Sequence, residues 1–426
     1  MDCMRRMLLM GVLLLSGSEA FSQGETAVPF LLIPTSVEGN GMGGIAASLI
    51  SDDAISTISN PAQLGIFSLD NVFSASTYSP KTPWLASLSD DISLDATAFN
   101  AGINFEKYLK LPAPISFGVG YSQIYFDLGN FNYTSSSGPQ VTSTYHAYEK
   151  CDNLSFGFGI EYKVKLSLGY SFKWIDSELG PIEVLPDSFT GSTTAKLPAH
   201  DYGAILQVPV VEIVSDISKT QFDINDKVEP MLDFTFGAAR RNIGGEVNYG
   251  TIYSDPLPRQ GVLGWHFELG LKSQISNKPW KLLTFTWGRE AEDVLVNVST
   301  VGDTVLTRII SYKNGLGSIR PFENLVIGKA SGGIYLQTGW QFQIAECLYV
   351  RGGSYTAPGD LSYSTQGESF KLNGFLKLLV SLNMVETHSK LFSYLLDHFD
   401  LQYHVSNYTN SLQDGTTFHS INVVFK

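Results

Sequence analysis

Hydrophobic and polar residues alternate with a period of two along most of this chain from about Asn71 onward. Clear examples cover residues 99–106, 154–162, 166–174, 265–272 and 334–343. In the second example the apolar positions are Leu154, Phe156, Phe158, Ile160 and Tyr162, and the positions between them are Ser155, Gly157, Gly159 and Glu161. Because successive side chains of a β-strand point to opposite faces, each segment predicts a strand with one apolar face. We count roughly fourteen to sixteen such segments, within the range of transmembrane barrels.

The polar face of these strands distinguishes a membrane barrel from a soluble sandwich. It consists mainly of Ser, Gly, Asn and Gln with single charges, whereas a sandwich would present Lys, Glu and Thr to water. Small polar side chains suit the crowded wall of a modest lumen. After the first residues no run reaches the ~20 apolar residues that a membrane helix needs, so only a closed barrel could span a membrane. We predict an all-β, transmembrane antiparallel β-barrel over residues 69–426.

The last strand also favours closure. Residues 418–426 place Ile421, Val423 and Phe425 on one face, and the aromatic residue is penultimate. A terminal strand of this kind is the signal that the barrel assembly machinery reads. Pairing with the first strand would remove an exposed edge that invites aggregation.

The alternation assigns one polar face to the lumen. The lumen-lining candidates are Glu268, Lys272, Gln337, Gln341, His398, Asp400 and His404. The last three form a stripe with Gln402 that could bind a metal ion or a lumen cation, although zinc sites need convergent His or Cys ligands. We favour a hydrogen-bonded wall and predict no metal site.

Four stretches interrupt the strand pattern, at residues 127–152, 209–229, 291–318 and 386–397. The third has the pattern of a small hairpin, and the fourth carries Leu391, Phe392, Leu395 and Leu396 at helical spacing. Because barrels keep short periplasmic turns and long outer loops, we expect these stretches mostly on one rim. Aromatic residues near the strand ends are expected to form interfacial girdles. These are Trp174, Trp280, Trp287, Trp340, Tyr121, Tyr125, Tyr162 and Tyr349.

The N-terminal part of the chain differs from the rest. Residues 1–22 have the basic, apolar and small-residue regions of a signal peptide. Residues 23–68 lack the period of two, and we interpret them as a compact hatch inside the barrel. Gly39–Gly44 matches G-x-G-x-x-G, but no βαβ pattern follows, so close backbone packing is favoured over a dinucleotide site.

Composition narrows the functional classes. The net charge is −13, charged residues are 16% and aromatic residues 12% of the chain. This balance excludes disorder and disfavours nucleic acid as a partner. No G-x-S-x-G or H-E-x-x-H motif is present, so we predict no enzyme and no cofactor. A Ser–His pair assembled across strands is not excluded by the sequence. Cys151 and Cys347 could form a disulfide, but two cysteines define no framework.

Two motifs resemble one family. The first combines residues 41–44 with Asp52-Asp53-Ala54 and Asn60-Pro61-Ala62-Gln63-Leu64; the second combines residues 242–247 with Tyr249, residues 255–259 and Leu263-Gly264. Together they resemble the signatures of PorV/PorQ-like outer-membrane proteins, relatives of the FadL fatty-acid transporters. The resemblance implies a barrel of about fourteen strands in the outer membrane, surrounded by outer-membrane lipid. It also implies an N-terminal hatch whose candidate folding and gating positions are Gly41, Gly43, Gly44, Asn60 and Pro61.

The resemblance leaves two non-enzymatic functions open. PorV-like members serve type IX secretion, which would make secretion subunits or cargo the partners of this chain. FadL-like members pass hydrophobic molecules across the outer membrane, which would require an apolar pocket above the hatch. The closer motif match favours the first function, and the mixed polar lumen predicted above weakens the second without excluding it.

Overall fold

The computed structural model describes residues 26–426 apart from residues 86–90, 110, 112, 135–139, 181–192, 221, 223, 225–227, 250–253, 276–277, 302–306, 331–332, 358–361, 386–388 and 411–413. The predicted signal peptide, residues 1–22, lies outside the described residues, as do the first residues of the predicted hatch. Within the described part of the chain, no helix combines the length and the apolar character needed to cross a membrane.

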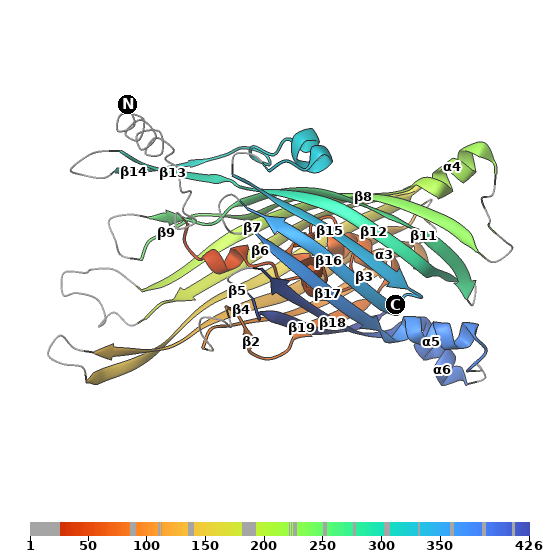
Figure 1. Ribbon diagram of the computed structural model, residues 1–426, viewed down its shortest axis with the longest axis horizontal. Helices are drawn as coiled ribbons and strands as arrows, with labels where there is room; N and C mark the ends of the chain where they lie inside the picture. Colours follow the sequence, from red (N-terminus) through yellow and green to blue (C-terminus); the bar gives the residue numbers. More distant parts are fainter. Residues whose placement is uncertain are drawn as a thin grey trace, which may run out of the picture.

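Fourteen strands of the described chain form one antiparallel sheet that closes into a barrel (Figure 1). Each of them pairs with the barrel strands next to it in sequence, and β1 closes the wall by pairing with both β3 and β19. The barrel strands are β1 (Phe73–Tyr78), β3 (Ser93–Asn104), β4 (Ile115–Thr134), β5 (Val141–Tyr162), β6 (Val164–Glu178), β7 (Thr194–Pro209), β8 (Glu229–Gly244), β11 (Gln260–Ile275), β12 (Lys278–Val294), β15 (Ile334–Ile344), β16 (Leu348–Thr356), β17 (Tyr363–Lys371), β18 (Phe399–Thr409) and β19 (Thr417–Phe425). The predicted closed barrel is confirmed.

The two faces of the wall differ as the alternation predicts. In β18, Leu401 and Tyr403 are exposed outside, whereas Asp400, Gln402 and His404 are buried inside. Large apolar side chains are exposed around the exterior, among them Phe158, Leu168, Trp174, Leu269, Trp340, Val350 and Ile421. A closed barrel with an apolar exterior and a polar interior is the architecture of an outer-membrane protein, and it places this chain in that membrane.

The girdle prediction is only partly right. Trp174, Trp340, Tyr121 and Tyr162 are exposed on the exterior, and Trp287 and Tyr125 are half-buried. Trp280 and Tyr349 are buried instead. The Trp280 indole donates to the carbonyl of Ala345 at 3.1 Å, beneath a tight turn. Tyr349 points inward because it has the same parity in β16 as the buried Arg351.

Connections between strands alternate between the two ends of the barrel. One end has turns of only one residue after β5 and three residues after β15, which is typical of the periplasmic side. We call this end the turn rim and the opposite end the loop rim. The chain's last residue, Lys426, follows β19 at the turn rim (Figure 1).

The expected location of the long connections on one rim is wrong. Helices α4 (Val210–Ser218), α5 (Leu372–Ser381) and α6 (Lys390–His398) lie at the turn rim, whereas the hairpin of β13 (Val296–Val301) and β14 (Thr307–Tyr312) lies at the loop rim (Figure 1). The hairpin and α6 themselves confirm the predictions for those two stretches. Residues 127–152 are not a simple loop, because β4 and β5 continue their pairing through most of them, as far as the pair Thr134 and Val141.

The N-terminal segment forms a plug inside the barrel (Figure 1, red to orange). Its short helices are η2 (Pro29–Leu32), α2 (Val37–Gly41), η3 (Ala54–Ile58) and α3 (Gln63–Asp70). Most side chains from Thr35 to Leu69 are buried. Helix α3 contacts β3 to β6 and α2 contacts β16 to β19, so the two helices rest on separate arcs of the wall. The plug therefore bridges the lumen.

Small elements complete the described chain. They are β2 (Thr82–Pro83), η4 (Phe105–Lys107), β9 (Glu246–Val247), β10 (Asp255–Pro256) and the π-helix η6 (Pro321–Ile327). Leu325 of η6 packs against Ile334 and Leu336 and covers them, which explains why these apolar residues of β15 are buried. Cys151 and Cys347 are both buried and free, so they form no disulfide.

Candidate functional site

The plug backbone rests on a row of wall glycines. The row is continuous because Gly102 pairs with Gly118, Gly118 with Gly157, Gly157 with Gly169, and Gly169 with Gly203. A Cβ atom at Gly169 would lie 2.2 Å from the amide nitrogen of Ala62, and one at Gly203 would lie 1.9 Å from Asn60 Oδ1. Only residues without a side chain permit this approach. The glycine row therefore defines where α3 sits on the wall.

Asn60 and Pro61, two of the hatch candidates, lie on this row. The Asn60 amide donates to the carbonyl of Ala47 at 2.7 Å, and its Oδ1 accepts from the amide of Ala62 at 3.0 Å. The first bond ties two segments of the plug together, and the second fixes the turn into α3. Pro61 stacks on Gly169, where its carbonyl would be 2.4 Å from an added Cβ.

The candidate glycines face a separate arc of the wall. Gly43 has a φ of +76°, and its amide donates to Thr365 Oγ1 at 2.8 Å. Gly44 has a φ of +98°, so both positions favour glycine. A Cβ at Gly41 would be 3.0 Å from the Cα of Gly367. These positions pack the plug tightly; their role in gating stays a prediction.

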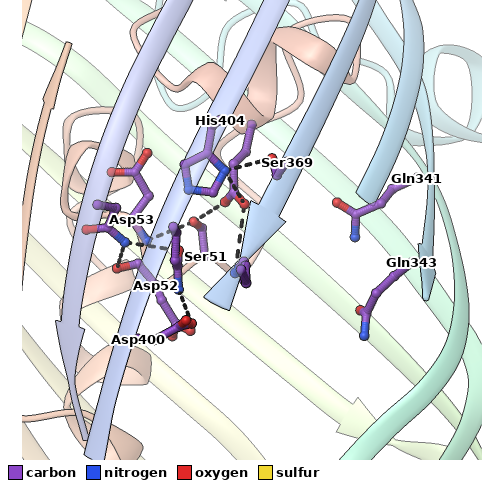
Figure 2. Close-up of polar contacts among 12 residues, drawn as sticks. Ser51, Asp52, Asp53, Gln341, Gln343, Ser369, Asp400 and His404 are labelled. Carbon is purple, nitrogen blue, oxygen red and sulfur yellow. Dashed lines mark hydrogen bonds and ion pairs between the residues drawn. The ribbon is translucent and has the colours of Figure 1, made fainter. Parts of the chain in front are cut away.

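A buried ionic cluster joins α2 to three neighbouring strands. Glu38 Oε1 lies 2.9 Å from Arg351 of β16, 4.0 Å from Lys371 of β17 and 3.4 Å from His404 of β18. The Ser51 hydroxyl also donates to Glu38. Figure 2 shows His404 beside Ser369 on the adjacent strand, with the plug residue Ser51 close to them.

This cluster determines the charge state of two plug carboxyls. Burial raises the pKa of Glu38, but the facing groups His404, Lys371 and Arg351 lower it by more, so it lies below its usual value. Burial raises the pKa of Asp53 to about 6, and the nearby charge of Glu38 adds to that rise. Glu38 is therefore the anion that the cluster stabilises, whereas Asp53 binds a proton as the pH falls slightly below neutral.

The cluster contains a Ser–His pair that does not have the geometry of a catalytic triad. Ser369 Oγ lies 2.7 Å from His404 Nδ1, and Glu38 approaches the same ring nitrogen. A triad needs the serine and the carboxylate on opposite ring nitrogens. His404 is fully buried and its Nε2 has no hydrogen-bond partner within the described structure. The arrangement positions the plug and gives no accessible nucleophile.

Six of the seven lumen-lining candidates face the interior or the turn rim, and His398 is the exception. Gln337, Gln341, Asp400 and His404 are buried on the inner wall. Glu268 is paired with Lys281 at 2.8 Å, and Lys272 pairs with Glu212 of α4 at 2.7 Å near the turn rim.

The prediction that His398 belongs to the polar stripe of the last strands is wrong. It is the last residue of α6 and not part of β18, and its Nδ1 lies 3.1 Å from the carbonyl oxygen of Lys426. The strand alternation begins one residue later than the sequence pattern suggests. Among the described residues, no group of three or more His, Cys, Asp or Glu could hold a metal ion.

A pocket of about 270 Å³ lies between η2 and the wall, in the half of the barrel nearer the loop rim. Phe30, Leu32 and Ile33 of the plug form one side. The other side is an aromatic ladder across four neighbouring strands, made of Tyr335, Tyr355, Tyr363 and Tyr408, with Trp84 beside it. The rings of Tyr355 and Tyr363 stack with centroids 4.7 Å apart. Most of the pocket surface is therefore apolar or aromatic.

One corner of the pocket is polar. Arg241 lies 3.1 Å from Glu292, and Gln337 donates to Glu292 at 3.4 Å. Glu290 also lines this corner and accepts from the backbone amides of Ala47 and Ser48 at 3.1 and 3.2 Å. We call Arg241, Glu290, Glu292 and Gln337 the polar corner. It connects the pocket wall directly to the turn of the plug.

The mid-barrel motif has a structural role. Asn242 has a φ of 60° next to a break in the β7–β8 register. Its backbone amide donates to Asp201 Oδ1 at 2.7 Å, and Asp201 pairs with Lys173 at 2.7 Å. These buried groups hold the irregular backbone beside the plug. The motif therefore stabilises a bulge rather than a ligand site.

Sequence reasoning missed the charged residues that organise the site. Glu38 and Arg351 are separated by 313 positions, so no local spacing connects them. The inward parity of Glu290, Glu292 and Arg351 was the available signal, because a charged residue on a buried face needs a partner. The aromatic ladder could not be predicted either, because tyrosines at the polar positions of a strand are also typical of an ordinary lumen wall.

Comparison with known proteins gives similarity at the level of the fold. No protein-family model and no curated protein matches the chain. Among solved structures, the Pseudomonas putida toluene transporter TodX is 11% identical with a TM-score of 0.39, over 92% of this chain and 96% of that chain. The Ralstonia pickettii toluene transporter TbuX is 13% identical with a TM-score of 0.33, over 93% and 98%. A Pseudomonas aeruginosa FadL homologue is 11% identical with a TM-score of 0.35, over 92% and 96%.

Similarity this distant carries no argument about function. It gives no support to the predicted kinship with PorV/PorQ or to a role in type IX secretion. A functional conclusion therefore has to come from the pocket, the plug and the wall of this chain.

Proposed function

We propose that this protein is an outer-membrane channel for a small, largely apolar compound that carries one polar group. The observation that carries the proposal is the pocket of about 270 Å³ between the plug and the aromatic ladder. Ligand sites are mostly apolar cavities with a few placed polar groups, and this pocket is close to their lower size range. The apolar wall would accept the body of the compound and the polar corner its single polar group.

The position of the pocket fits uptake rather than storage. It lies in the loop-rim half of the barrel, and the plug with its glycine row and ionic cluster lies between it and the turn rim. A compound that enters from outside would be desolvated against the tyrosine rings before it meets the plug. Release toward the periplasm would then require the plug to shift or the wall to open.

Binding of a fluorescent apolar probe such as 1-aminoanthracene tests the proposal. The purified protein in phospholipid nanodiscs should bind the probe saturably, and proteoliposomes that contain it should take the probe up faster than empty vesicles. Val294→Trp should abolish both, because Val294 lines the pocket and indole would fill it. Val350→Trp is the matched control, since Val350 is exposed on the exterior.

Two results would reject the proposal. One is the absence of saturable binding in the unmodified protein. The other is equal binding and uptake by the Val294→Trp and Val350→Trp variants, which would show that the probe partitions elsewhere.

A further inference from the structure

The first inference concerns the polar end of the transported compound and rests on the proposed function. The charged residues among the described pocket lining are one arginine, Arg241, and two glutamates, Glu290 and Glu292. Arg241 is already engaged by Glu292 at 3.1 Å. The described lining therefore offers a ligand carboxylate no cation that is not already paired, away from bulk water. Such an anion would be poorly compensated.

Two buried polar atoms in the same corner lack partners in the described structure. They are Arg241 Nε, a donor, and Gln337 Oε1, an acceptor. Gln337 is 2% exposed, so its unpaired oxygen is costly unless a ligand or water meets it. A hydroxyl group can both accept from a guanidinium and donate to an amide oxygen. An amine or ammonium group can donate to the same oxygen and to the two carboxylates.

We infer that the pocket selects compounds whose polar end is a hydroxyl or an amine and discriminates against carboxylates. The pairing of Arg241 with Glu292 leaves an anionic head without a counter-ion, and the unpaired donor and acceptor of the polar corner match a neutral or cationic hydrogen-bonding head. The aromatic ladder accommodates the apolar body in each case, so selection occurs at the head.

Competition among octanol, octylamine and octanoate for the bound fluorescent probe tests this selection, because the three share one chain and differ at the head. Octanol and octylamine should displace the probe, and octanoate should bind at least about tenfold more weakly, a difference of about 1.4 kcal/mol. Glu292→Gln should narrow the gap by strengthening octanoate binding. Glu368→Gln, a change at an exposed carboxylate of β17 facing outward, should leave all three affinities unchanged.

The possible outcomes separate the two proposals. Octanoate binding as tight as octanol binding in the unmodified protein would overturn the head selection and leave the channel function intact. Failure of the probe itself to bind would reject the channel function. The unmodified protein decides the question even if Glu292→Gln does not fold.

A second inference has an independent basis in the three helices of the turn rim. Val210, Ile213, Val214 and Ile217 lie on one face of α4, and Ile217 is 76% exposed. In α5 the polar residues Asn373 and Lys377 are buried toward the barrel, whereas Phe375 and the following residue Leu382 are exposed. In α6, Leu391 and Tyr394 are exposed.

Helix α5 is inverted relative to a helix on a water-soluble surface. The Asn373 amide donates to the carbonyl of Leu396 at 2.7 Å, and Lys377 pairs with Glu346 at 3.4 Å, so the polar face of α5 is used for packing. Its apolar face points away from the protein. A helix with an outward apolar face needs an apolar neighbour.

The lipid-facing exterior of the barrel continues into this apolar face. Phe370, exposed on the exterior of β17, contacts Phe375 of α5 with ring centroids 5.8 Å apart. We propose that α4, α5 and α6 lie in the head-group region of the periplasmic leaflet, with their apolar faces against phospholipid acyl chains. Amphipathic helices bind membrane interfaces in that orientation, and their length is not what decides it.

Spin-label accessibility tests this location in nanodiscs of phosphatidylethanolamine and phosphatidylglycerol. Nitroxides at Ile217→Cys and Leu391→Cys should be reached by oxygen and shielded from a water-soluble nickel chelate. Asp216→Cys is the matched control, because Asp216 lies next to Ile217 on the polar face and should show the reverse. The native Cys151 and Cys347 are buried, so the unsubstituted protein should take up no label.

Equal exposure of the Ile217 and Asp216 positions to the nickel chelate would overturn the proposal. So would labels that are accessible to nickel in nanodiscs but shielded from both reagents in the native cell envelope, because a protein partner would then cover the helices.

Discussion

At the scale of single residues, Glu38 links the plug to the barrel wall. Its carboxylate faces Arg351, Lys371 and His404, which come from three consecutive strands. Burying these charges costs solvation free energy, and the attraction between Glu38 and its partners offsets that cost only while they remain in contact. The cluster is therefore more effective at fixing the position of the plug than at stabilising the barrel as a whole.

Glu38→Gln should loosen the plug without unfolding the barrel. Removing one partner leaves Arg351 as a buried, uncompensated cation, and such losses cost about 3–5 kcal/mol. Hydrogen exchange of the backbone amides in residues 36–70 should accelerate accordingly, while the amides of the barrel strands should keep their protection. Glu368→Gln serves as the control, because an exposed side chain usually contributes less than about 0.5 kcal/mol. Unchanged exchange in Glu38→Gln would show that the cluster does not hold the plug.

The protonation of Asp53 should make plug stability depend on pH. Its folded-state pKa of about 6 lies above the usual 3.8, so the folded plug binds this proton more tightly than the unfolded segment does. The contribution of Asp53 to stability should therefore rise as pH falls from above 6 towards 4, by up to about 3 kcal/mol. Glu38 opposes this trend only at lower pH, because its pKa lies below its usual value.

Exchange of the plug amides, corrected for the intrinsic pH dependence of exchange, measures this effect. Protection should be greater at pH 5 than at pH 7.5 in the unmodified protein, and Asp53→Asn should remove most of the difference. The same difference in the Asn variant would assign the pH dependence to another group.

At the scale of elements, α3 can pack directly on the barrel wall because the wall has a row of glycines, without side chains, at the contact. Gly169→Ala should displace α3, since the new Cβ would lie 2.2 Å from the amide nitrogen of Ala62. Overpacking of this kind costs about 1–3 kcal/mol and should appear as faster exchange in α3. Gly245→Ala is the matched control, because nothing lies within 4 Å of a Cβ there. Equal exchange rates of the α3 amides in the two variants would mean that the glycine row does not position α3.

The sequence predicts the strands well and the site poorly for a physical reason. Lipid and lumen impose opposite polarity on the two faces of every strand, so stretches such as Leu154–Tyr162 reveal their structure locally. The extension of β4 and β5 into residues 127–152 leaves the membrane, and polar residues such as Ser143 and Thr144 then hide the strand.

Helix α5 was missed because its polarity is inverted, with Asn373 and Lys377 inside and Phe375 outside. The ionic cluster and the polar corner were missed because their members come from distant strands. Only barrel closure and register bring Glu38 next to Arg351 or Arg241 next to Glu292. Parity along a strand predicts that a residue faces inward, but it does not predict which residue it will meet.

At the scale of the whole molecule, the plug and the pocket divide the lumen into a binding compartment and a barrier. The plug contacts two separate arcs of the wall through α2 and α3, and the pocket between the plug and the aromatic ladder lies on its loop-rim side. A barrel of this kind should be closed to ions at rest, and conduction should require the plug to leave its seat.

Conductance across planar lipid bilayers tests the barrier. The unmodified protein should show little steady current, and Gly169→Ala and Glu38→Gln should raise the frequency of open events, because each weakens a different contact of the plug. Their effects on plug opening should add, since the glycine row and the ionic cluster lie on separate arcs and share no residue. Gly245→Ala should remain closed. A steady open-pore current from the unmodified protein would show that the plug leaves a continuous aqueous path, and the barrier would then have to lie elsewhere in the wall.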